Sequence, residues 1–178
     1  DYSLFIHRDD PHITYMTVYV DDIIITGSNS AHIQLMKQHL DTVFSIKDLG
    51  VLHYFLGMEI SYLPEGVVVS QKKFTKELLD YCPDTLPTRA VTPLPLHLKL
   101  SSSGSPPLSD PEMYRSLLGK LNFLINTRPD LSYTIQLLSQ FMHAPNTTHY
   151  EALLHTLSYV KNTAGQGILL QGADNLTL

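Results

Sequence analysis

The sequence predicts an α+β fold in which an antiparallel sheet with a helix precedes a mainly helical segment. Three observations predict it. Two runs of strand-forming residues meet at Asp21-Asp22, the turn sequence Pro64-Glu65-Gly66 separates two further runs, and apolar residues recur at helical spacing beyond residue 112. A length of 178 residues suffices for one domain, or for one domain with a satellite.

The N-terminal part is predicted to be a sheet covered by one helix. Strand formers occupy residues 2–6 and 14–19, and Asp9-Asp10-Pro11 between them is a turn sequence. The chain turns again at Asp21-Asp22. After Ser28-Asn29-Ser30, which can cap a helix, apolar residues at helical spacing predict a helix with one face on the sheet: Ile33, Met36, Leu40, Val43 and Phe44.

A second hairpin and further helices follow. The strand-rich runs 52–63 and 67–70 form the hairpin, and residues 72–81 are predicted to be a short helix. The stretch 82–111 is rich in Pro, Ser and Thr and is the best candidate for a linker, although it is apolar at Leu94, Leu96, Leu98 and Leu100. Three helices that could form a small bundle are predicted beyond it, over 113–127, 131–142 and 148–163.

One polar motif and one set of histidines in the helical part have structural explanations. In Arg128-Pro129-Asp130, Pro129 suits the first helical turn, Asp130 suits the positive end of the dipole, and Arg128 is free to pair nearby. Three histidines recur every six residues, which does not place them on one helix face as metal ligands. We therefore expect surface histidines at His143, His149 and His155.

Charge and cysteine content limit the possible functions. The net charge of −5 argues against a stand-alone nucleic-acid binder. The charge is uneven, however, since residues 1–70 hold three basic and nine acidic residues, and residues 71–128 hold eight basic and five acidic ones. The single cysteine, Cys82, excludes an internal disulfide and a Cys-based zinc site and fits a reducing compartment. No apolar run is long enough to span a membrane, so we expect a soluble fragment.

The adjacent carboxylates Asp21 and Asp22 are the main candidates for chemistry. Side chains alternate along a strand, so both could reach one ion only from a tight turn. Such an oxygen pair suits Mg²⁺, which takes one or two carboxylates together with substrate phosphates, and phosphoryl transfer would be the chemistry. The alternative is an ordinary hairpin turn with solvated carboxylates. The spacing of the residues leaves both interpretations open.

Tyr19-Val20-Asp21-Asp22 also resembles the Y-x-D-D box of reverse transcriptases. Its flanks, Val18 and Ile23-Ile24-Ile25-Thr26-Gly27, resemble the form found in copia-type LTR retrotransposons. Further motifs follow in the family's order: Lys47-Asp48-Leu49-Gly50, Phe55-Leu56-Gly57-Met58-Glu59-Ile60, Tyr114-Arg115-Ser116-Leu117-Leu118-Gly119 and Thr127-Arg128-Pro129-Asp130-Leu131-Ser132-Tyr133. The resemblance covers nearly the whole chain, and it extends to short plant reading frames, some of them uncharacterised mitochondrial proteins, that are relics of copia-type polyproteins.

The resemblance implies a partial palm with the acidic and primer-grip hairpins over 1–81, a linker over 82–111, and a thumb and connection segment over 112–178. Asp21 and Asp22 would be catalytic ligands of Mg²⁺ or Mn²⁺ in two-metal nucleotidyl transfer, with Tyr19 and Val20 near the primer end. In the family a third carboxylate comes from a strand well upstream. The poor substitutes for it in this chain are Asp1, Asp9 and Asp10.

The resemblance also assigns contacts with nucleic acid. Phe55, Leu56, Gly57 and Met58 would form the primer grip, where Gly57 permits a close backbone approach. The alternative is a plain strand with a bulge at Gly57. Lys47 would protonate the pyrophosphate leaving group, although a solvated ion pair with Asp48 is the simpler interpretation. The remaining candidates either contact template or primer phosphates or form a solvated helix face: Lys72, Lys73 and Lys76.

The function implied is that of a fragment of an RNA-directed DNA polymerase, acting on template-primer and dNTPs within a Pol polyprotein that has fingers upstream and RNase H downstream. The location implied is intracellular, in a cytoplasmic virus-like particle or the nucleus, without a membrane; a mitochondrial relic is a further possibility. We expect the fragment alone to be inactive. The alternative is a degenerate or domesticated relic that acts only as an interaction module, which fits two departures from the family pattern, at Cys82-Pro83-Asp84 and Lys161-Asn162-Thr163.

Overall fold

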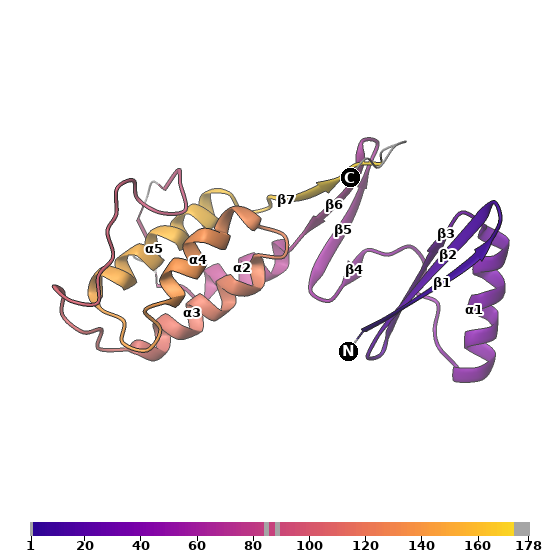
Figure 1. The fold of residues 1–178 in the computed structure, drawn as a ribbon, viewed down its shortest axis with the longest axis horizontal. Helices are drawn as coiled ribbons and strands as arrows, with labels where there is room; N and C mark the ends of the chain where they lie inside the picture. Colours follow the sequence, from indigo (N-terminus) through magenta and orange to yellow (C-terminus); the bar gives the residue numbers. More distant parts are fainter. Residues whose placement is uncertain (1, 84–85, 88–89, 173–178) are drawn as a thin grey trace. The chain divides into compact units, whose positions relative to one another are not determined.

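The computed structural model describes residues 2–83, 86–87 and 90–172 and confirms the α+β class, with antiparallel sheets and helices (Figure 1). The chain forms two compact units, residues 1–55 and 56–178, and each is described by itself. The second hairpin therefore groups with the helices. The predicted division into 1–81, 82–111 and 112–178 concerns functional subdomains and stays a prediction. None of the described helices is long and apolar enough to cross a membrane.

The first unit is a three-stranded meander with one helix. Its strands pair antiparallel in the order β1-β2-β3, and the turn at Asp10-Pro11 lies where it was predicted. Asn29 caps the helix, because its side chain accepts a hydrogen bond from the backbone N–H of His32. The elements are β1 (Tyr2–Asp9), β2 (His12–Tyr19), β3 (Asp22–Gly27), α1 (Ser30–Phe44) and the two-residue strand β4 (Tyr54–Phe55).

This first unit has almost no buried core. Helix α1 contacts β3, yet none of its residues is fully buried, and the predicted inner residues Val43 and Phe44 are more than half exposed. On β1, Leu4, Phe5 and Ile6 are exposed as well. The sheet and helix thus form as predicted, but they bury little apolar surface within the unit.

The second unit contains the hydrophobic core, in a group of helices beside the strands β5, β6 and β7, which pair antiparallel in that order. Buried leucines recur along α3 at helical spacing, and the Tyr114 hydroxyl donates to the carbonyl of Leu138 at 2.8 Å. The elements are β5 (Met58–Leu63), β6 (Gly66–Ser70), α2 (Lys72–Asp80), α3 (Pro111–Leu124), the short 3₁₀ helix η1 (Pro129–Leu131), α4 (Ser132–Ser139), α5 (Thr147–Asn162) and β7 (Gly167–Leu170).

Strand β7 is a structural difference from the expectation of a purely helical segment over 112–178. After α5 the chain returns to lie beside β6 (Figure 1), with Val69 opposite Ile168 and Ser70 opposite Gly167. A strand of four residues next to Gly165 and Gly167 has too little local pattern to be recognised. Residues 173–178 of the predicted segment lie outside the described residues.

The stretch predicted as a linker packs against the helical core. The side chains of α5 bond to its carbonyls, with Thr156 donating to Pro93, Ser158 to Pro87 and Asn162 to Ala90. Several of its leucines also contact the core, namely Leu86, Leu94, Leu98, Leu100 and Leu108. Its described residues are therefore an irregular strap on the helices, in agreement with its apolar content.

Arg128-Pro129-Asp130 has the predicted structural role. Pro129 opens η1, and the Arg128 guanidinium, 4% exposed, bonds to both carboxylate oxygens of Asp130 at 3.0 and 2.8 Å. Arg128 also donates to the carbonyl and hydroxyl oxygens of Thr163. The Tyr159 hydroxyl donates to Asp130. The cluster therefore connects η1 to the end of α5.

The expectation of a surface position is wrong for His149, which is fully buried. It is the third residue of α5, where its Nδ1 accepts from the backbone N–H of Asn146, and its ring stacks on Phe141 with centroids 3.8 Å apart. Histidine replaces the usual Glu or Gln of a capping box, so the spacing of the histidines could not reveal the role.

The buried His149 predicts a pH dependence. Burial lowers its pKa below the usual value of 6.5, and a protonated Nδ1 could not accept from Asn146. Because the folded pKa is depressed, the stabilisation is complete above the unfolded pKa of about 6.5 and is lost as the pH falls below it. We expect the free energy of unfolding to decline less between pH 7 and 5 in His149→Gln than in the unaltered chain. The exposed control His143→Gln should leave this decline unchanged. A decline unchanged in His149→Gln would contradict the assignment.

Candidate active site and nucleic-acid interface

The acidic pair lies at the tip of the β2-β3 hairpin. Tyr19 pairs with Asp22 across the two strands, so Val20 and Asp21 form a two-residue turn. This is the tight turn that the two carboxylates need if they are to serve one site. The predicted hairpin tip is therefore present in the structure.

Val20 has an unusual backbone conformation, with φ of 50°. Two-residue hairpin turns normally place Gly, Asn or Asp at left-handed positions, and a β-branched residue there is an outlier. Such strain costs roughly 1–3 kcal/mol and concentrates at functional sites. The side chain is 74% exposed, so burial does not compensate for the strain. The turn therefore has a conformation that its residue types alone would not select.

Relieving this strain has an expected result. Val20→Asn should raise the free energy of unfolding of the first unit by about 1 kcal/mol, because asparagine tolerates the left-handed region. Protection of hairpin amides from hydrogen exchange measures the effect. The control is Val91→Asn, at a valine that is 90% exposed without a positive φ, where we expect no gain. Equal effects of both substitutions would contradict the strained turn.

The carboxylates of Asp21 and Asp22 are both exposed, and within the described ranges neither belongs to an ion pair. Their oxygens therefore fit a hard cation such as Mg²⁺, which uses one or two carboxylates and completes its octahedron with water and phosphates. The described residues contain no group of three or more His, Cys, Asp or Glu side chains placed to hold a metal. Two carboxylates are thus what this hairpin supplies.

The other N-terminal aspartates lie away from this tip. Asp9 pairs with His12 and Asp10 lies in the adjacent turn, both at the opposite end of β2 from Tyr19. Along eight residues of strand, this separation is roughly 24 Å. Neither can share an ion with Asp21, and Asp1 lies outside the described residues.

Lys47 is exposed beyond α1 and makes no ion pair in the described part of the chain. The expected pairing with Asp48 is wrong, because Asp48 bonds Lys37 at 3.0 Å instead. The Asp48 carboxylate also accepts from the N–H of Gly50, and both bonds hold its pKa below the usual value. The Lys47 ammonium is left available for another partner.

The primer-grip candidates form a tight turn in front of β5 rather than a bulge. Leu56 has φ of 50° and Gly57 has φ of 80°, and β5 begins at Met58. The single strand predicted over 52–63 is thus interrupted, with Phe55 ending β4 before the turn. Gly57 is required here by its positive φ.

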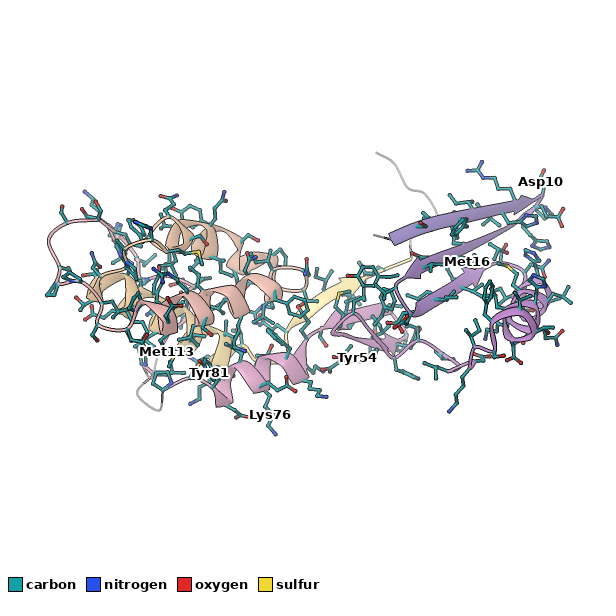
Figure 2. All side chains as sticks on the ribbon, turned by 90° about the horizontal axis from the view of Figure 1, so that it is seen from below. Asp10, Met16, Tyr54, Lys76, Tyr81 and Met113 are labelled. Atoms are coloured by element: carbon teal, nitrogen blue, oxygen red, sulfur yellow. The ribbon has the colours of Figure 1, made fainter. Side chains whose placement is uncertain are left out.

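The basic candidates lie on the exposed side of α2. Lys72, Lys73 and Lys76 are all exposed, and the Lys76 side chain points away from the neighbouring helices (Figure 2). Glu59 on β5 accepts from the backbone N–H of Lys73 at 2.6 Å and so caps the start of α2. The sequence did not predict this role for Glu59, because the two residues are 14 positions apart.

Antiparallel strands with paired aspartates at a hairpin tip, followed by a second hairpin and helices, are consistent with a nucleotide-polymerising enzyme. Residues 2–94 match the family model described as "Reverse transcriptase (RNA-dependent DNA polymerase)", and the chain belongs to this family. Within the family it is related to copia-type Pol polyproteins. No solved structure gives a significant match.

The named relatives include two polyproteins and one shorter protein. The chain is 40% identical over its whole length to each of the "Retrovirus-related Pol polyprotein" sequences from transposons RE2 and RE1 of Arabidopsis thaliana, and it spans 12% of their length. It is 37% identical over 92% of its length to the "Uncharacterized mitochondrial protein AtMg00810" of the same plant and spans 68% of that protein.

Proposed function

We propose that this chain is the C-terminal part of a copia-type reverse transcriptase domain and that Asp21 and Asp22 are its metal-binding carboxylates in two-metal nucleotidyl transfer. The main support is the turn at Val20, where a strained backbone presents two adjacent carboxylates that form no ion pair with any described residue. The family match supports the reaction class and implies divalent metal in intact enzymes. The palm, linker and thumb assignments for 1–81, 82–111 and 112–178 belong to this proposal.

Each residue has a chemical role in this proposal. Bound Mg²⁺ would lower the pKa of the primer hydroxyl and neutralise the triphosphate. Asp21 and Asp22 provide the negative charge that holds the ions, and Tyr19 and Val20 border the primer end. Lys47, which is exposed and forms no ion pair among the residues that the structure describes, is available to protonate the pyrophosphate leaving group.

Residues 55–58 and helix α2 would bind the nucleic acid. The turn from Phe55 to Met58 presents backbone to the primer end, since Gly57 carries no side chain. Lys72, Lys73 and Lys76 would neutralise phosphates, and their contacts should weaken with salt. Template-primer and dNTPs are therefore the substrates of the intact polyprotein, which would act inside the cell.

We further propose that the chain is inactive by itself. The hairpin supplies two carboxylates, whereas the two-metal reaction needs a third, bridging one. The first unit also leaves Leu4, Phe5 and Phe44 exposed, so little packing fixes the hairpin tip. Catalysis requires that the catalytic groups are positioned within a fraction of an ångström. Loss of this positioning alone raises the activation free energy by several kcal/mol.

The second candidate is a non-enzymatic relic that acts as an interaction module. The net charge of −5 favours it, because an isolated nucleic-acid binder would be basic. In that case the exposed apolar faces of the first unit are the interaction surface, and the aspartates have no ligand. The two candidates differ in their metal binding.

A Mn²⁺ titration of the whole chain, followed by paramagnetic broadening of amide signals, tests the proposal. We expect saturable broadening centred on residues 19–22, at least tenfold weaker in Asp21→Asn and unchanged in Asp41→Asn, an exposed carboxylate on α1. Broadening that is spread over all carboxylates and removed by 0.5 M salt would favour the relic. Primer extension by the isolated chain that Asp21→Asn abolishes would overturn its proposed inactivity.

A further inference from the structure

Phe123 is an aromatic residue on α3 that stays 40% exposed, although the next residue, Leu124, belongs to the hydrophobic core. Its ring packs edge-on against Phe74 of α2, with centroids 4.9 Å apart and planes at 72°. This geometry is favourable for two aromatic rings. It fixes the Phe123 ring between two elements although one side of the ring faces solvent.

The Phe123 ring also lies against the turn in front of β5. A Cβ placed on Gly57 would lie 3.0 Å from Cζ and 3.2 Å from Cε1 of Phe123. These distances are closer than ordinary van der Waals contact, so the ring edge fills the space that a side chain at Gly57 would need. Gly57 is thus required twice, by its φ of 80° and by the ring.

A second link holds the same elements together. Glu59 accepts from the N–H of Lys73, and Phe74, the next residue, is the partner of Phe123. Contacts therefore link β5 to α2, α2 to α3, and α3 back to the turn that precedes β5. The lysines on the outer side of α2 belong to the element held against the turn.

We propose that Phe123 is a positioning residue for the turn Leu56-Gly57. It sets the place of the turn's backbone relative to the exposed lysines of α2, so that a primer end at the turn and phosphates at Lys72, Lys73 and Lys76 are bound together. The inference rests on the proposed function for its nucleic acid, whereas the contact between Phe123 and Gly57 can be tested without it.

The variants are Phe123→Leu, the conservative Phe123→Tyr, and Tyr133→Leu as control, at an α4 aromatic that is 74% exposed. The first readout is the chemical shift of the Gly57 α-protons in the whole chain, which a ring in contact displaces. We expect Phe123→Leu to lose the displacement, Phe123→Tyr to retain it and Tyr133→Leu to leave it unchanged. An unchanged shift in Phe123→Leu would overturn the inference.

The second readout is binding of a duplex with a recessed 3′ end, relative to a blunt duplex of equal length. We expect Phe123→Leu to reduce this preference about tenfold while the salt dependence from the lysines stays the same. Phe123→Tyr should restore the preference. A recessed-end preference that survives in Phe123→Leu would also overturn the inference.

Two measurements separate this proposal from general destabilisation and from the proposed function. The thermal midpoint of Phe123→Leu should stay within about 3 °C of that of the unaltered chain, because a partly exposed ring contributes little to the core. Gly57→Ala disturbs the same contact from the other side, with Phe123 itself left unsubstituted, and should also reduce the preference. If the unaltered chain shows no preference at all, the proposed function fails, and the Gly57 shift still decides the positioning role.

Discussion

Replacing Asp130 with asparagine should lower the free energy of unfolding of the second unit by about 3 kcal/mol, because it leaves a buried arginine without its counter-charge. Arg128 is only 4% exposed, and Asp130 receives two of its bonds. Arg128→Met should cost less, since the carboxylate left behind is 37% exposed and can be solvated. The double variant should be more stable than Asp130→Asn alone. Urea unfolding of all three variants measures the difference.

The matched control is Glu112→Gln, which breaks the exposed pair with Arg115 in the same unit and should change stability by less than about 0.5 kcal/mol. A pH titration adds a second test. Arg128 holds the pKa of Asp130 below 3.8, so the stabilisation is present above that value and is lost as the pH falls through the lower folded pKa. If Asp130→Asn and Glu112→Gln lower the free energy of unfolding equally, the buried Arg128 does not need the Asp130 carboxylate for stability.

Gly167→Ala should detach β7 from β6. A Cβ at this position would clash with the carbonyl oxygen of Val69 and lie 2.9 Å from Cβ of Ser70. Both belong to the paired strand, where movement would break the ladder, so we expect a cost of about 2 kcal/mol. Hydrogen exchange should show lost protection at β6 amides, while the amides of α3 stay protected.

Gly172→Ala is the control for this substitution, since no described residue apart from its chain neighbour lies within 4 Å of an added Cβ there. We expect its exchange pattern to match that of the unaltered chain. Full protection of β6 in Gly167→Ala would mean that the strand is not held as closely as the structure indicates.

Much of the fold could be predicted because its signals are local. The turns at Asp10-Pro11 and Pro64-Glu65-Gly66 contain residues that favour turns, and the cap at Asn29 directly precedes a helical pattern. The three helices beyond residue 111 follow from leucine spacing. In each case the determining residues are neighbours in the chain.

The parts that could not be predicted depend on distant contacts. Strand β7 exists because β6 offers it a partner about 100 positions earlier in the chain. Lys37 is preferred over Lys47 by Asp48 because of where α1 presents it. The burial of His149 depends on its stacking with Phe141, a residue outside α5.

In the candidate site too, the features set by neighbouring residues could be predicted and those set by distant contacts could not. The acidic pair and its hairpin were predicted from residues 15–27, and the structure has the hairpin tip there. The left-handed conformation of Val20 was not predicted, because valine rarely adopts a positive φ. Phe123 and Glu59 also carry no sequence signal, since each acts on a residue in another element.

The pairing of β6 with β7 has a consequence for the order of folding. Val69 cannot pair with Ile168 until Ile168 has been synthesised, and at about 5–20 residues per second this delay is several seconds. During this interval one edge of β6 is open to other strands, and closing so long a loop is slow. The second unit should therefore complete its sheet last, and chains that stop before residue 167 should aggregate more readily than the 178-residue chain.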